Sequence, residues 1–289
     1  MKLFKSFSNY LSLVKFSHTI FAMPFALIGF FLAVVYENKD FDWKIFIAII
    51  LCMIFARSAA MAFNRYIDEK FDKLNPRTAV REIPAGIIKK ENAFLFVIIN
   101  CILFIATTFF INKICFYLSP VALFTILFYS YTKRFTALCH VVLGVGLSLA
   151  PIGAYLAVTG FFDILPILFS FVVLTWVSGF DILYALQDED FDKEHKLNSI
   201  PTLLGRKKAL VVSILLHLIT AIIVLAIGYI GCFNYVYWIG ASLFIGLLIY
   251  QHTLVKPNDI SKVNMAFATT NGIASVVFAI FVIVALYMQ

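Results

Sequence analysis

Apolar residues occur along the chain in long, continuous stretches rather than in alternation with polar ones. A helix needs about 20 consecutive apolar residues to cross the hydrocarbon core of a bilayer. We find nine such stretches, at roughly 16–36, 45–64, 93–111, 114–131, 137–158, 161–180, 208–230, 234–254 and 264–287. Their continuity excludes a transmembrane β-barrel. The pattern predicts an all-α integral membrane protein with nine transmembrane helices, in which residues 1–289 form a single domain.

The composition agrees with a membrane protein. Hydrophobic residues make up 62% of the chain and charged residues 13%, with a mean hydropathy of +0.96. An average soluble domain has about 25% charged residues. The five cysteines have no metal-ligand spacing, so we interpret them as small hydrophobic residues. Phe16–Tyr36 is too long for the apolar core of a signal peptide and has no cleavage site, so we expect it to remain as the first span.

The basic residues orient this predicted topology. When the loops are assigned to alternating sides, 19 Lys and Arg residues fall on one side and only three fall on the other. Cytoplasmic loops carry the excess of Lys and Arg. We therefore expect a multi-pass protein of the cytoplasmic (inner) membrane, with its N-terminus in the cytoplasm and its C-terminus outside. The net charge of +7 has the same source, and we expect no nucleic-acid partner.

Two of the predicted cytoplasmic loops are long, at about 65–92 and 181–207, and they resemble each other. The segments Asp68–Lys73 and Asp188–Lys193 are identical at five of six positions. Each segment follows the second helix of a four-helix block. The simplest interpretation is an internal duplication: two pseudo-repeated four-helix blocks, plus a final helix, around a central cavity to which both loops contribute.

Both loops begin with clustered carboxylates. If the helix continues past the membrane surface, residues at i, i+4 and i+8 lie on one face. Like charges at this spacing repel each other, so the clusters call for a cation. Mg²⁺ is typically held by one or two carboxylates, by waters and by substrate phosphates. The first cluster is Asn64, Asp68 and Asp72, and the second is Asp181, Tyr184, Asp188 and Asp192.

Basic residues lie near both clusters. Arg77 and Arg81 follow the first cluster, Lys133 and Arg134 end the fourth apolar stretch, and Arg206 follows the second cluster. Arginine can hold phosphate oxygens in a forked geometry. Acids and bases around one cavity indicate a Mg²⁺–diphosphate site, with room behind it in the apolar bundle for a hydrocarbon tail. Solvated loop charges would be the ordinary explanation for one such cluster, but two matching copies favour a site.

These motifs resemble those of the UbiA-type aromatic prenyltransferase superfamily. The first signature is Asn64-Arg-Tyr-Ile-Asp68-Glu-Lys-Phe-Asp72 with Asn75-Pro-Arg-Thr-Ala-Val-Arg-Glu-Ile-Pro-Ala-Gly86, and the second is Asp181-Ile-Leu-Tyr-Ala-Leu-Gln-Asp-Glu-Asp-Phe-Asp192. Tyr129-Ser-Tyr-Thr-Lys133 matches a further Y-x-x-x-K motif. Lys15-Phe-Ser-His-Thr19 and the region from Asn264 to Asn271 extend the resemblance along the chain.

The resemblance implies a nine-helix enzyme that moves a prenyl group from an allylic polyprenyl diphosphate to an acceptor, with Mg²⁺ as cofactor. It implies that the metal is held by Asn64, Asp68, Asp72, Asp188 and Asp192. It implies diphosphate binding by Asn64, Arg77, Lys133 and Arg134. Asp181 and Tyr184 would line the reacting centre and act in catalysis together with Asp68, Asp72, Asp188 and Asp192.

Arg57 lies within the second apolar stretch, two turns before Asn64. An arginine at that depth is energetically expensive and marks a functional hypothesis. It could bind the carboxylate of an aromatic acid acceptor, or it could pair with Asp181. His18 and His195 are possible acid–base groups, but their spacing does not argue for such a role.

Two questions stay open at this stage. The expected acceptor is an aromatic acid in respiratory quinone biosynthesis, with 4-hydroxybenzoate favoured and a dihydroxynaphthoate of menaquinone biosynthesis as the alternative. The chain has Arg81-Glu82 where many hydroxybenzoate enzymes have Arg-Pro, which weakens the assignment of one acceptor. A secondary transporter is the alternative from another class, but it would place its polar residues near the bilayer midplane.

Overall fold

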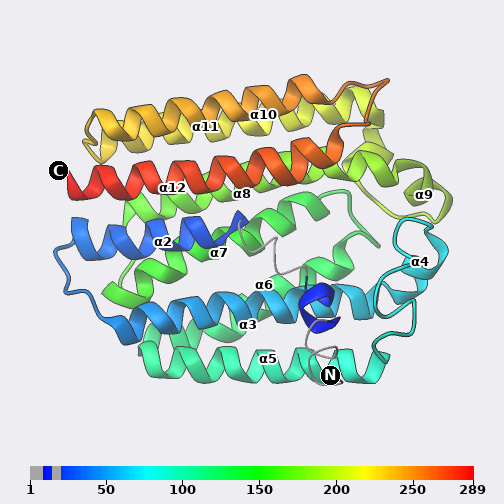
Figure 1. The fold of residues 1–289 in the computed structure, drawn as a ribbon, viewed down its shortest axis with the longest axis horizontal. Helices are drawn as coiled ribbons and strands as arrows, with labels where there is room; N and C mark the ends of the chain where they lie inside the picture. Colours follow the sequence, from blue (N-terminus) through cyan, green and yellow to red (C-terminus); the bar gives the residue numbers. More distant parts are fainter. Residues whose placement is uncertain (1–8, 15–20) are drawn as a thin grey trace.

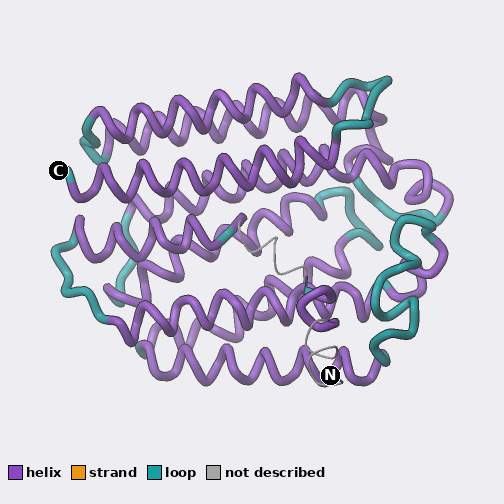
Figure 2. The backbone as a smooth tube through the Cα atoms, viewed as in Figure 1, coloured by secondary structure: helices purple, strands orange, loops and turns teal. Residues whose placement is uncertain are grey.

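The computed structural model describes residues 9–14 and 21–289, and this part of the chain contains helices and no named strand. The long helices run side by side along the longest axis of the molecule (Figures 1 and 2). In the first half they are α2 (Met23–Phe31) with the π-helical η2 (Leu32–Tyr36), α3 (Trp43–Ile67), α5 (Lys90–Ile111) and α6 (Lys113–Thr132). The second half contains α7 (Cys139–Thr159), α8 (Ile164–Ala185), α10 (Ile200–Ile230), α11 (Tyr235–Leu254), and α12 (Asn271–Tyr287) preceded by the π-helical η4 (Met265–Thr270).

Several apolar helices confirm a membrane protein. Within the described ranges, seven helices are long and apolar enough to cross a membrane: α3, α5, α6, α7, α8 with its extension to Glu194, α10, and η4 together with α12. The two other predicted segments correspond to the shorter apolar helix Met23–Tyr36 and to α11. The beginning of the first predicted segment, with Lys15 and His18, lies outside the described residues. The count of nine spans therefore stays a prediction.

Four long helices begin with a polar cap at one end of the bundle. The first backbone N–H groups of a helix have no partner inside it, and a side-chain oxygen at the N-cap satisfies one of them. Figure 1 places these four helix starts at the end that also holds the C-terminus. The caps are Asp42 for α3, Asn112 for α6, Asp163 for α8 and Asn234 for α11.

Close contacts between helices hold the middle of the bundle together. A Cβ atom built on Gly29 of α2 would lie 2.0 Å from the carbonyl oxygen of Pro151 in α7, so only glycine permits this approach. Beside it, fully buried aromatic rings from α2, α8, α11 and α12 pack together, including Phe25, Trp176, Phe244 and Phe278. These rings fill the interior of this half of the bundle. They thereby support α8, whose other end lies at the opposite end of the molecule.

The opposite end of the bundle carries two short helices, α4 (Glu69–Leu74) and α9 (Glu189–Glu194). They lie next to each other at this end, together with the connection between α11 and η4 (Figure 1). Each short helix contains most of one copy of the repeated acidic segment, whose first aspartate directly precedes the helix. The fold therefore brings the two long loops to one end of the molecule, as the sequence predicts.

Candidate active site

A cavity of about 200 Å³ lies at this end of the bundle. Its walls come from α3, α6 and α8, from both long loops, and from the short helices α4 and α9. The residues predicted to bind metal or diphosphate or to act in catalysis all line it, whereas the predicted acceptor-binding residue Arg57 does not: the lining includes Asn64, Asp68, Asp72, Arg77, Lys133, Arg134, Asp181, Tyr184, Asp188 and Asp192. The two acidic segments thus face one shared cavity.

The acidic residues do not lie on straight helices, which corrects one sequence expectation. Helix α3 ends at Ile67, Asp68 has a non-helical ψ of 7°, and α4 begins at Glu69. The second motif is interrupted by a 3-10 turn, η3 (Leu186–Asp188), between α8 and α9. Backbone hydrogen bonds still join Asp68 to Asn64 and Asp72 to Asp68. The bends change the direction of the chain at the cavity while the i, i+4 contacts persist.

In the first motif, both carboxylates pair with arginines. Asp72 is almost fully buried, and Nη1 of Arg81 lies 2.7 and 3.0 Å from its two oxygens. Asp68 receives Nη2 of Arg134 at 3.3 Å and Nδ2 of Asn64 at 3.2 Å. Burial raises the pKa of Asp68, and the hydrogen bond from Arg134 opposes that rise. The charge of this motif is therefore balanced from the neighbouring loop and from the end of α6.

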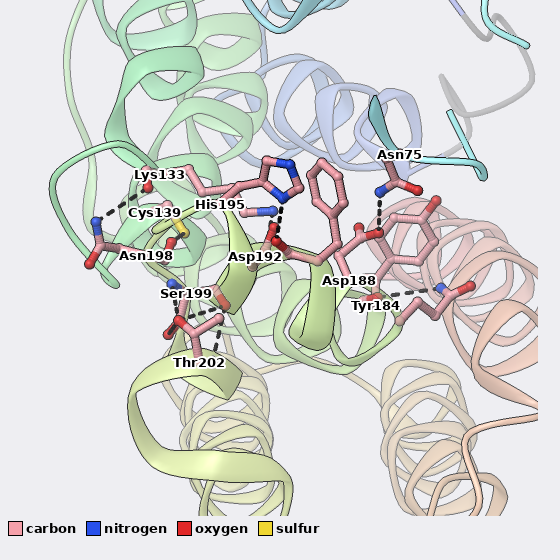
Figure 3. A network of polar contacts seen from close by, with 12 residues as sticks. Asn75, Lys133, Cys139, Tyr184, Asp188, Asp192, His195, Asn198, Ser199 and Thr202 are labelled. Atoms are coloured by element: carbon pink, nitrogen blue, oxygen red, sulfur yellow. Dashed lines mark hydrogen bonds and ion pairs between the residues drawn. The ribbon is translucent and has the colours of Figure 1, made fainter. Parts of the chain in front are cut away.

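The second motif is balanced from the other half of the chain. Arg77 of the first loop holds Asp188 with two nitrogens, Nε at 3.1 Å and Nη2 at 2.5 Å, and Asn75 donates to the same carboxylate at 3.2 Å. Lys133 lies 2.7 Å from Asp192. Figure 3 shows Lys133 next to Asp192, and Asn75 reaching Asp188. These contacts across more than 50 residues join the two halves into one site.

The repeated segment also has a part that does not line the cavity. Its glutamate accepts from the lysine four residues later: Glu69 from Lys73 at 2.8 Å, and Glu189 from Lys193 at 2.6 Å. A second basic residue, near the start of the next long helix, also contacts each glutamate. Lys90 lies 2.8 Å from Glu69, and Arg206 lies 2.6 Å from Glu189. Together, hydrogen bonds from Lys73 and Lys90 hold the pKa of Glu69 below its usual value.

This arrangement explains the match between the repeats. The two aspartates line the cavity, the glutamate and lysine fasten the short helix, and the phenylalanines Phe71 and Phe191 are further cavity walls. Arg206 belongs to the fastening part and not to the cavity lining, contrary to the expectation from sequence. His195, for which the sequence spacing does not argue an acid–base role, stacks on Phe191 with centroids 4.0 Å apart and contacts Phe71 edge-on. It joins α4 to α9.

Tyr184 and Asp181 lie on α8, before Asp188 in the chain and closer to the interior of the bundle. The Tyr184 hydroxyl accepts from Nη1 of Arg77 at 2.9 Å, and its ring packs on Phe267 of η4 with centroids 4.2 Å apart. Asp181 pairs with His140, whose Nδ1 lies 2.7 Å from the Asp181 carboxylate. Sequence reasoning missed His140. The signal was available, because His140 is an ionisable residue inside the apolar stretch 137–158.

Arg57 lies away from the cavity lining, on α3. Its Nε is buried and has no hydrogen-bond partner in the described part of the chain. The pairing of Arg57 with Asp181, one of the two sequence alternatives, is not seen, since Asp181 contacts His140 instead. Because no salt bridge of Arg57 is seen among the described residues, the other alternative, an anionic ligand, stays open.

The donors of the cavity suit Mg²⁺. In residues 9–14 and 21–289, no three His, Cys, Asp or Glu side chains converge into a ready-made metal cage. Mg²⁺ does not require one, because it keeps several waters and shares substrate phosphates with one or two carboxylates. The available side-chain donors are hard oxygens. Asp192 Oδ1 is buried and has no hydrogen-bond partner in the described ranges, so it is an acceptor that a metal or its water would satisfy.

Comparisons with known proteins agree with this geometry. A model of the UbiA prenyltransferase family matches residues 22–276. A 4-hydroxybenzoate octaprenyltransferase from Tolumonas auensis is 32% identical over 223 residues, which cover 77% of this chain and 78% of the relative. A protein of the same name from Aliivibrio fischeri is 28% identical over 239 residues and 82% of each chain.

Solved structures show the same fold. A UbiA homologue from Aeropyrum pernix K1 superposes with a TM-score of 0.84 at 28% identity, covering 94% of this chain and 98% of the other. A UbiA homologue from Archaeoglobus fulgidus, solved with DMAPP and Mg²⁺, superposes with a TM-score of 0.71 at 20% identity over 97% of this chain and all of the other. On the family match and the Tolumonas relative together, the chain belongs to the UbiA prenyltransferase family, and it is a membrane-bound prenyltransferase.

Proposed function

We propose that the protein transfers a polyprenyl group from an allylic polyprenyl diphosphate to an aromatic acid, in a Mg²⁺-dependent step of respiratory quinone biosynthesis. The favoured acceptor is 4-hydroxybenzoate. One observation carries the proposal: the carboxylates of both motifs and their cationic partners surround a single cavity. The names of the curated relatives support the acceptor, and the Archaeoglobus homologue bound to DMAPP and Mg²⁺ supports the donor and the metal.

The acid–base pairs give the site its chemistry. When bound, Mg²⁺ would neutralise charge that develops on the departing diphosphate. Its ligands would be drawn from Asn64, Asp68, Asp72, Asp188 and Asp192. The cations Arg77, Lys133 and Arg134, now paired with three of these carboxylates, would then turn to phosphate oxygens. Exchanging partners in this way keeps the cavity close to neutral in both states, which matters because uncompensated buried charge is costly.

The reacting centre lies deeper than the diphosphate. Asp181 precedes Asp188 by seven residues on α8 and η3, about 10 Å at 1.5 Å per residue of helix. Tyr184 lies between them, oriented by Arg77 on one side and by Phe267 on the other. A diphosphate held at the outer carboxylates would place the allylic carbon near these two side chains. The isoprenoid tail would extend between the apolar helices.

Arg57 would bind the acceptor's carboxylate. It lies seven residues before Asn64 on α3, again about 10 Å deeper than the metal ligands. Its unpartnered guanidinium nitrogen matches an anionic ligand at that depth. An aromatic acid anchored there would direct its ring toward Asp181 and Tyr184. This placement favours an aromatic acid over an uncharged acceptor.

The long loops would face the cytoplasm. Both lie at one end of the bundle, and the charge bias along the sequence supports a cytoplasmic position for that end. In a variant without native cysteines, Lys89→Cys or Lys196→Cys should react with an impermeant thiol reagent only after the cells are opened. Labelling of intact cells at either position would show that the loops face the outside.

A single site shared by both motifs predicts how the effects of substitutions in the two motifs combine. Asp72→Asn and Asp192→Asn should each lower turnover of polyprenyl diphosphate and 4-hydroxybenzoate by roughly three orders of magnitude or more, since the departing diphosphate loses its metal. The double variant should be little worse than either single one, because groups that act as a unit are non-additive. Product is measured by mass spectrometry of membranes, with excess chelator as a parallel test of the metal requirement.

Asp190→Asn is the matched control for these variants. Asp190 lies on the same short helix, its side chain is 88% exposed, and it is not part of the cavity lining, so its activity should stay near wild type. Independent sites would instead leave about half of the activity in each single variant. That result, or full turnover in excess chelator, would reject the shared Mg²⁺ site.

The proposed role of Arg57 predicts that the enzyme prefers an acceptor that carries a carboxylate. Arg57→Ala should raise KM for 4-hydroxybenzoate and lower kcat/KM by roughly 10- to 100-fold, the equivalent of one charge-assisted hydrogen bond. KM for the prenyl diphosphate should change little. The control is 4-hydroxybenzamide, which lacks the anion: wild type should prefer the acid, and the variant should lose this preference. An equal loss of activity with both acceptors would show that Arg57 does not bind the acceptor's carboxylate.

A further inference from the structure

His140 and Asp181 form a pair unlike the other acid–base pairs of the cavity. Among the described cavity residues, the carboxylates of Asp68, Asp72, Asp188 and Asp192 each contact an arginine or a lysine. Asp181 instead contacts a histidine at 2.7 Å. Arginine and lysine remain charged and cannot readily accept a proton, so their partners are held as anions for a metal. A carboxylate that is paired with a histidine can instead act as a proton acceptor.

The hydrogen bonds of the histidine indicate its tautomer. The backbone N–H of Ile200 donates to Nε2 of His140 at 3.3 Å, so Nε2 carries the lone pair. The proton then lies on Nδ1 and is donated to Asp181 Oδ2. The Ile200 N–H belongs to the first turn of α10, where backbone donors have no helical partner. The assignment follows from this hydrogen-bond network.

The position of the pair suits its role. The side chain of His140 is 3% exposed and lies behind Asp181, whose side chain is 22% exposed and lines the cavity. Only the carboxylate can therefore reach a substrate, while the imidazole holds it from the protein side. Cys139, Asn198 and Ser199, which precede His140 and Ile200 along the chain, lie near one another, to the left of Asp192 in Figure 3.

We propose that His140 positions Asp181 as the base that removes the ring proton of the aromatic acceptor. This inference rests on the proposed function. A ring π-electron pair bonds to the allylic carbon, and the diphosphate leaves with the electrons of the broken C–O bond. The ring carbon then bears both its hydrogen and the prenyl group. Asp181 takes this proton, and the C–H electron pair restores the aromatic ring. Asp181 is the catalytic residue, and His140 acts through it.

Isotope substitution at the ring tests this step. With 4-hydroxybenzoate deuterated at the positions next to the hydroxyl, wild type should show an isotope effect on kcat close to one, because proton loss is fast. Asp181→Asn should lower kcat by roughly 100-fold or more, the contribution of a general base. Proton loss then limits turnover, so the same variant should show a primary isotope effect well above one.

Two amide variants separate positioning from structure. In His140→Asn the amide nitrogen replaces Nδ1 and can still donate to Asp181, whereas in His140→Gln the amide oxygen replaces Nε2 and can still accept from Ile200. We expect Asn to retain kcat within a few fold of wild type. Gln and Ala should each lose about tenfold or more and show the isotope effect, because an orienting partner is removed. Thermal stability in detergent is recorded for all three variants.

The outcomes are distinct. Retention of kcat by Gln with loss in Asn would show that His140 serves only to cap α10, and it would overturn the inference. Loss of kcat in Asp181→Asn without an isotope effect would also overturn it, as would wild-type turnover in that variant. Absence of prenylated product from wild-type protein with 4-hydroxybenzoate would instead reject the proposed function on which the inference rests.

Discussion

Five carboxylates share one small cavity at the end of an apolar bundle, and the balance of their charge is the constraint on which the site depends. Charges that are partly removed from water interact strongly and are stable only when paired. The fold meets this constraint by bringing a cationic or imidazole partner to each one. Several partners come from a distant part of the sequence, so the ion pairs also fasten the first loop and α6 to the second motif.

The shapes of both loops follow from the same constraint. The bends at Asp68 and at η3 turn the acidic segments across the end of the bundle, where Asp188 meets Arg77 of the first loop and Asp192 meets Lys133 at the end of α6. Glu69 and Glu189 hold the short helices to the next long helices through salt bridges. The glutamates are largely buried while their basic partners remain partly exposed, and the repetition of these pairs at both copies indicates a positioning role. The core around Trp176 provides the rigid support for α8 behind them.

The acidic motifs, their duplication and most of their basic partners could be predicted from the sequence, because charge in an apolar chain is rare and its spacing is visible. The bends could not, since the i, i+4 spacing of Asn64 and Asp68 looks the same in a straight helix. The sequence also could not show which base pairs with which acid: Arg77 bridges to the other motif and Arg206 does not face the cavity, and both pairings depend on tertiary packing. His140 was missed because its neighbour Asp181 is 41 residues away.

The central claim is that carboxylates and bases exchange partners when Mg²⁺ and diphosphate bind together. Calorimetry with purified protein and inorganic diphosphate tests it, with Mg²⁺ or with chelator. We predict that diphosphate binds at least about tenfold more tightly with Mg²⁺, a coupling of roughly 1.4 kcal/mol. Asp188→Asn should lose most of that dependence, while Asp190→Asn should keep it. Equal affinity of the wild-type protein for diphosphate with and without Mg²⁺ would contradict the account.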